Sequence, residues 1–134
     1  MIRITLGVVF FAHGAQKLLG WFGGAGLKDT MRTMHQFLGL PIPLAFLAIA
    51  TEFFGGAGLI AGLLSRLAAL GIGVTMVAAI LMVHGRYGLF LNWFGDRKGN
   101  GIEYHLLAIA LAAVIIVRVS GALSLDRLLY ASII

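Results

Sequence analysis

Six ionisable side chains occur within apolar stretches of this sequence or at their ends. They are His13, Lys17, Glu52, His84, Glu103 and His105. Ionisable residues inside a bilayer are rare and usually face a bundle interior or a cavity, so each is a candidate functional residue. Glu52 is the most informative, because a buried carboxyl group needs a proton or a neighbouring cation, and His13 and Lys17 are the expected neighbours. This set favours proton exchange or the binding of an anion.

Four apolar stretches must position these side chains, and each is long enough to cross a membrane as a helix. They cover approximately residues 2–21, 44–64, 66–84 and 102–120. In lipid every backbone group needs an internal partner, which favours helices over sheet. We therefore expect an all-α membrane protein, a bundle of four transmembrane helices that forms a single domain over residues 1–134. Because His13, Gln16 and Lys17 stand where a signal peptide would have small residues, we interpret the first stretch as an uncleaved span.

The composition agrees with lipid as the solvent. Of the 134 residues, 60% are hydrophobic and 11% are charged, whereas soluble domains carry about a quarter charged residues. There is no cysteine, which excludes disulfides, thiolate metal sites and dithiol redox chemistry within this chain. The net charge of +5 comes from basic residues that flank apolar runs, so we expect them to contact lipid headgroups and not nucleic acid.

The connections between the stretches differ in character. Residues 27–38 have apolar side chains at helical spacing and end at Gly39 and Pro41, which predicts a short amphipathic helix in the membrane interface. Residues 85–101 combine aromatic residues with a charged turn, as expected of a loop in the headgroup layer. Ser65 marks a tight hairpin. At the other end of the chain, residues 124–127 predict a capped helix.

Connectivity brings the six ionisable residues to the same side of the membrane. The ends of the first and third stretches and the beginnings of the second and fourth must share that side. At a rise of 1.5 Å per residue, His13 lies roughly 12 Å from Trp21, and Glu52 lies roughly 13 Å from Pro43. The sequence therefore predicts a polar pocket that opens at one end of the bundle, and a plain apolar hairpin and tail at the other end.

Simpler interpretations remain open for several of these residues. The polar set could be a structural network that fixes helix register, and Lys17 could extend to the headgroups. Gly55, Gly56, Gly58 and Gly62 form a predicted packing stripe, which could also leave room beside Glu52 for a flat ligand such as a quinone. No pair of residues has the spacing of a metal site on one helix, so we expect no metal.

Several motifs in order along the chain resemble the DoxX family of small bacterial membrane proteins. They are His13-Gly14-x-Gln16-Lys17-Leu18, Gly39-Leu40-Pro41-Ile42-Pro43, Glu52-x-x-Gly55-Gly56, Gly101-Ile102-Glu103-Tyr104 and Ser124-Leu125-Asp126. The resemblance implies a four-helix protein of the bacterial cytoplasmic membrane, related to the membrane subunit of a thiosulfate:quinone oxidoreductase. By position, the family's polar motif residues fall on His13, Gln16, Lys17, Glu52, Glu103 and Tyr104.

Three functions follow as hypotheses. The first is a membrane subunit of an oxidoreductase that anchors partner subunits and forms a quinone or proton site. Glu52, His13 and Lys17 would then exchange protons or hold an anion, and the pocket would be lined by Gln16, Gly55, Gly56, His84, Glu103 and Tyr104. The second is a non-enzymatic structural or assembly subunit. The third is a transporter or channel, which would require a homo-oligomer.

Overall fold

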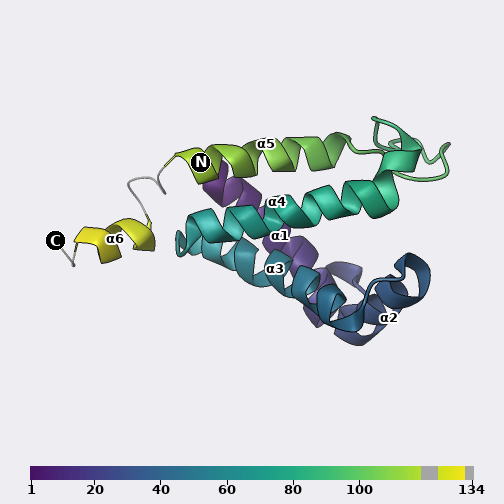
Figure 1. Ribbon diagram of the computed structural model, residues 1–134, viewed down its shortest axis with the longest axis horizontal. Helices are drawn as coiled ribbons and strands as arrows, with labels where there is room; N and C mark the ends of the chain where they lie inside the picture. Colours follow the sequence, from purple (N-terminus) through teal and green to yellow (C-terminus); the bar gives the residue numbers. More distant parts are fainter. Residues whose placement is uncertain (119–123, 132–134) are drawn as a thin grey trace.

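The computed structural model describes residues 1–118 and 124–131, and all regular secondary structure in these residues is helical. Figure 1 shows α3, α4 and α5 running along the long axis, with α2 at one end and α6 at the other. The helices are α1 (Ile2–Leu19), α2 (Gly26–Leu38), α3 (Ile42–Ala61), α4 (Ser65–Ala79), α5 (Glu103–Val117) and α6 (Leu125–Ala131). Short helical turns are η1 (Trp21–Gly23), the π-helical η2 (Ile80–His84) and η3 (Gly85–Tyr87).

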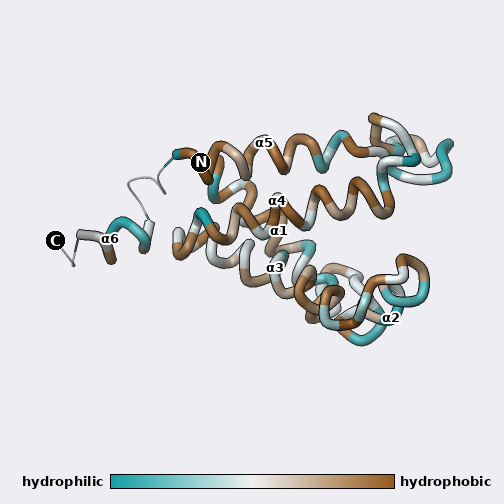
Figure 2. Tube along the Cα trace, in the orientation of Figure 1, coloured by the Kyte–Doolittle hydropathy of each residue, from teal (hydrophilic) through white to brown (hydrophobic). Residues whose placement is uncertain are grey.

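Two helical segments are long and apolar enough to cross a membrane. They are α3 and the continuous run Ser65–Tyr87, with mean hydropathies of 1.8 and 2.2. Only 33% and 17% of the residues in their most apolar 18-residue windows are buried inside the protein, so apolar side chains remain exposed along both segments, as in a membrane. Figure 2 shows this apolar character along α3, α4 and α5. The apolar α5 is shorter, and α1 carries polar residues near both ends.

These helices agree with the predicted stretches to within a few residues. The first stretch, predicted over residues 2–21, is α1 and ends at Leu19. The second, predicted over residues 44–64, is α3, from Ile42 to Ala61. The third continues through η2 and η3 to Tyr87. The fourth, predicted over residues 102–120, corresponds to α5, which ends earlier, at Val117, since Arg118 is extended; Ser120 lies outside the described residues.

Glycines bring α1 and α3 into close contact. A Cβ atom on Gly14 would overlap the backbone of Phe53, and one on Gly56 would overlap the backbone of Phe11. Backbones can approach this closely only where side chains are absent, which is the usual role of small residues between membrane helices. This contact sets the separation of Lys17 on α1 and Glu52 on α3.

The predicted single stripe of glycines on α3 is wrong. Gly56 faces α1, whereas Gly55 and Gly58 face α4, where Ile72 and Ala68 lie nearby. Gly62 ends α3 in the left-handed conformation, with φ of 74°. Because neighbouring atoms occupy these positions, the glycines serve helix packing and helix termination.

The segments at the end of the bundle near α2 have the predicted secondary structure, whereas their place in the membrane interface stays a prediction. The amphipathic helix is present as α2, which packs beside α1 and α3 and has no buried residue. The loop between Gly88 and Gly101 is closed by backbone hydrogen bonds from Gly101 N to Phe90 O, 3.1 Å, and from Ile102 N to Gly88 O, 3.0 Å. We call residues 88–101 the lid loop. Its ends are therefore fixed against the start of α5.

The opposite end of the bundle differs from its prediction. Ser124 caps α6 as expected, since its Oγ accepts a hydrogen bond from Arg127 N at 3.2 Å. In addition, the Asp126 carboxylate accepts hydrogen bonds from Leu64 N and Ser65 N, at 2.6 and 3.0 Å. The plain apolar hairpin and tail was therefore a wrong prediction, because the free N–H groups that begin α4 need acceptors.

Candidate functional site

A cavity of about 360 Å³ lies among α1, α3, α4 and α5. Its size falls in the range of small-molecule binding sites. Its lining residues are Phe10, His13, Lys17, Glu52, Met76, Ala79, His84, Leu91, Asn100, Tyr104 and His105. Five of the six ionisable residues singled out in the sequence thus line one cavity, at the end of the bundle where connectivity placed them.

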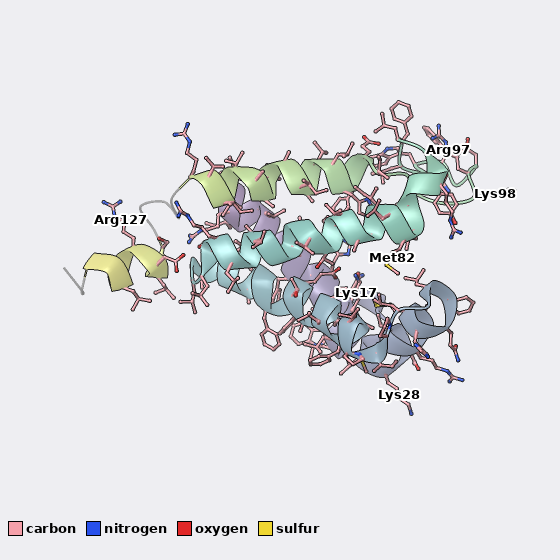
Figure 3. The ribbon with its side chains drawn as sticks, in the orientation of Figure 1. Lys17, Lys28, Met82, Arg97, Lys98 and Arg127 are labelled. Carbon is pink, nitrogen blue, oxygen red and sulfur yellow. The ribbon has the colours of Figure 1, made fainter. Side chains whose placement is uncertain are left out.

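Lys17 and Glu52 form an ion pair in the wall of the cavity. Lys17 Nζ lies 2.7 Å from Glu52 Oε1 and 2.6 Å from Oε2, so the ammonium group donates to both carboxylate oxygens. The side chain of Glu52 is 4% exposed and that of Lys17 is 35% exposed. Figure 3 shows Lys17 within the molecule, whereas Lys28, Arg97 and Lys98 lie at its periphery. Lys17 therefore pairs with Glu52 and does not extend to the headgroups.

Two histidines meet at the lid side of the cavity. The rings of His84 and His105 have their centroids 4.2 Å apart. The π-helical turn η2 carries His84, and its Nδ1 lies 2.8 Å from the carbonyl oxygen of Asn100 in the lid loop. His105 is buried at 5% exposure, and its Nδ1 has no hydrogen-bond partner among the described residues. Both imidazoles therefore retain hydrogen-bonding capacity toward the cavity.

Tyr104 lies between His13 on α1 and His105, its neighbour on α5. Its ring contacts Phe10, with a centroid distance of 6.2 Å, and meets the edges of His13 and His105 at 5.8 and 5.4 Å. The hydroxyl group is buried and finds no hydrogen-bond partner in the described part of the chain. A buried hydroxyl group without a partner is costly, so Tyr104 Oη is well suited to bind a polar ligand atom.

The remaining predicted site residues lie outside the cavity lining. Gln16 Nε2 donates to Phe22 O at 3.3 Å, and Glu103 Oε2 accepts from Leu91 N at 3.0 Å. Gln16 therefore holds the turn after α1, and Glu103 holds the lid loop. Gly55 and Gly56 pack between helices, as described above, and leave no lining surface in this cavity.

Sequence reasoning missed several lining residues. Phe10, Met76 and Ala79 look like ordinary apolar residues of a span, and Asn100 lies in a loop of polar residues. Helical spacing offered one signal, since Phe10 and Met76 recur on the buried faces of α1 and α4. Asn100 could not be found this way, because its contact with His84 depends on the path of the lid loop.

Metal binding has no support in the described residues. No group of three or more His, Cys, Asp or Glu side chains comes close enough there to hold an ion.

The comparisons with known proteins define the class of this protein. The DoxX family profile matches residues 1–85, so the chain belongs to the DoxX family and is a membrane protein.

Among curated proteins, the chain is 31% identical over 128 residues to the "Inner membrane protein YqjF" of Escherichia coli (strain K12), covering 95% of this chain and 88% of the relative. It is also 31% identical over 83 residues to the "Putative oxidoreductase CatD" of Bacillus subtilis (strain 168). That match covers 62% of this chain and 57% of the relative. No solved structure gave a significant match.

Proposed function

We propose that this chain is an integral membrane subunit of an oxidoreductase-type complex, and that its cavity is a quinone and proton site. In this proposal α1, α3, α4 with η2, and α5 cross the bacterial cytoplasmic membrane, and partner subunits supply the electron transfer. The observation that supports it most directly is the Lys17–Glu52 ion pair, with Glu52 buried and Lys17 partly exposed, in the wall of a cavity of about 360 Å³. A relative named as an oxidoreductase and one named as an inner membrane protein support the class.

The cavity offers the contacts that a quinone headgroup needs. Lys17 donates two hydrogen bonds to Glu52 and keeps a third N–H, and Tyr104 Oη has a hydrogen to donate. Both can bind a carbonyl oxygen. Phe10 and the Tyr104 ring give apolar surface for a flat ring. The site thus combines a few directed polar groups with apolar walls, as small-molecule sites do.

Quinone reduction takes up two electrons and two protons. The chain contains no cysteine, so dithiol chemistry must belong to a partner subunit or to the substrate. The protons can come from side chains of this chain. Glu52 and His13 both line the cavity and can hold and release protons, and Lys17 balances the charge of Glu52. The role of this chain is therefore to bind, orient and protonate.

Quinone reduction by the purified complex tests this role. We expect Glu52→Gln and His13→Ala each to lower the rate at least about 10-fold, the low end of the effect of losing a proton-transfer group. Matched controls are Asp29→Asn and His35→Ala, since both residues are exposed on α2 outside the cavity. Full activity in both cavity variants would rule out the proton site.

A non-enzymatic structural subunit is the second candidate, and the absence of cysteine favours it. Native mass spectrometry from mild detergent separates the two candidates. An oxidoreductase subunit should copurify with partner polypeptides and bound quinone, whereas a structural subunit should copurify with partners alone. A chain found only as a monomer or a homo-oligomer would argue against both.

The cysteine-free sequence also allows a direct test of the four crossings. We would introduce Thr33→Cys in α2 and Leu63→Cys in the hairpin, two exposed positions at opposite ends of the bundle. A membrane-impermeant maleimide should label one of them in intact cells and the other only after permeabilisation. Labelling of both from the same side would contradict the proposed arrangement.

A further inference from the structure

The His84–His105 pair has a geometry that the quinone contacts do not require. The ring centroids lie 4.2 Å apart at an interplanar angle of 38°, so the two imidazoles are in contact. They come from different elements, the π-helical turn η2 and α5. A π-helical turn inside a membrane-crossing helix disturbs its regular hydrogen bonding, and such turns occur frequently at functional sites. The pair is therefore a specific feature of the cavity.

The contact with the lid loop fixes the tautomer of His84. The carbonyl oxygen of Asn100 can only accept a hydrogen bond, so the Nδ1 atom of His84, 2.8 Å away, must carry a hydrogen. In the neutral ring Nε2 then has a free lone pair and can take up a proton. His105 is buried, and its Nδ1 has no hydrogen-bond partner among the described residues. His84 is thus held by the lid loop, and both imidazoles line the cavity.

The charged and titratable groups around the pair come from α1, α3 and α5. Facing the cavity are Lys17 and His13 from α1, Glu52 from α3, and Tyr104 from α5 beside His105. At the lid, Glu103 is engaged with Leu91 N. Glu103 does not line the cavity, and Lys17 and Glu52 neutralise each other, so no carboxylate that faces the cavity is left to stabilise two adjacent imidazolium ions. The pair can therefore carry one added proton but not two.

We infer that His84 and His105 carry one exchangeable proton between the lid loop and the cavity. The ring contact supports the sharing of one proton, whereas delivery of that proton to a reduced ligand depends on the proposed quinone site. The proton resides on His84 Nε2 or on His105, and because no hydrogen bond joins the two rings among the described residues, it moves between them through water in the cavity. From there it reaches the ligand oxygen, while the electrons arrive from the redox centre of a partner subunit. After transfer both rings are neutral and the cycle can repeat.

The shared proton is tested on the full chain in lipid nanodiscs, without any quinone. The four histidines are labelled with ¹⁵N, and the titration of His84 is followed by NMR in the unmodified chain and in His105→Asn. In a coupled pair, loss of one member should move the midpoint of the other by about one pH unit. His35→Asn is the control, since His35 lies on α2. An unchanged His84 midpoint in His105→Asn would overturn the inference, and the reciprocal His84→Asn variant gives the same test if His105→Asn does not fold.

Proton delivery is tested on the purified complex. We expect His105→Asn and His84→Ala to lower kcat for quinone reduction about 10-fold or more with little change in KM, because they remove proton transfer and not binding. Added imidazole should restore the rate of His84→Ala, which a merely structural role would not allow.

The outcomes separate the two proposals. Coupled titration with an unchanged kcat in both variants overturns delivery to the cavity but leaves the quinone site. Coupled titration in a complex that neither binds nor reduces quinone overturns the proposed function and, with it, delivery to a quinone, whereas the shared proton stands.

Discussion

The two ends of the bundle use polar residues in different ways. At the cavity end, Lys17 and Glu52 pair with each other, and Tyr104 Oη and His105 Nδ1 have no partner among the described residues. At the hairpin end, the Asp126 carboxylate binds two backbone N–H groups, and Asp126 N donates to Gly62 O at 2.9 Å. Polar groups at the first end face a cavity, and those at the second end connect three segments of backbone.

The comparison separates a polar network for binding from one for folding. A carboxylate that satisfies helix N–H groups removes a cost of helix ends and leaves little capacity for a ligand. An ion pair beside unpartnered side chains retains that capacity. Substitutions at the cavity end should therefore change both activity and stability, whereas those at the hairpin end should change stability alone.

Removing the charge of Lys17 should have the largest effect. Lys17→Met leaves the Glu52 carboxylate buried without its cation. We expect a loss of about 3 kcal/mol in the free energy of unfolding, the low end for a broken buried pair, because Lys17 is partly exposed. Steric trapping in bicelles measures this energy. The double variant Lys17→Met/Glu52→Gln should recover most of the loss, and a double variant as unstable as the single one would contradict this explanation.

Adding a methyl group at Gly62 should have the next largest effect. Gly62 has φ of 74°, and a Cβ atom there would overlap the guanidinium group of Arg3 and lie 2.6 Å from Ser124 Cβ. We expect Gly62→Ala to cost about 2 kcal/mol, from the left-handed conformation and from overpacking. The same stability assay measures it. Gly39→Ala is the control, since Gly39 has the same left-handed conformation, with φ of 65°, but nothing within 4 Å, so it should show the conformational cost alone.

The helices of the fold could be predicted from the sequence because apolar length is a local property. The second and third stretches, the amphipathic helix α2 and the cap at Ser124 all follow from spacing and composition. The partners of Asp126 could not be predicted this way. Its contacts with Leu64 and Ser65 join positions about sixty residues apart, and no local pattern records them.

The candidate site could be predicted in part, for a similar reason. Connectivity placed Glu52, Lys17 and His84 at the same end of the bundle, and the structure brings them to one cavity. Connectivity does not determine how each helix is rotated about its axis. The sequence therefore could not show that Gly56 faces α1 whereas Gly55 faces α4. It also could not show that His84 contacts His105, which depends on the π-helical turn.

Removing the cap provided by Asp126 should have the smallest effect and is the sharpest test of the comparison. Asp126→Ala leaves the N–H groups of Leu64 and Ser65 without this acceptor, which should cost about 1 kcal/mol, the typical cost of losing a helix cap. Hydrogen exchange should rise at the start of α4 and stay unchanged around Glu52. Binding and reduction of quinone by the complex should match those of the unmodified chain. A loss of activity larger than the loss of folded protein would show that the two ends are coupled, and that the hairpin end also serves the site.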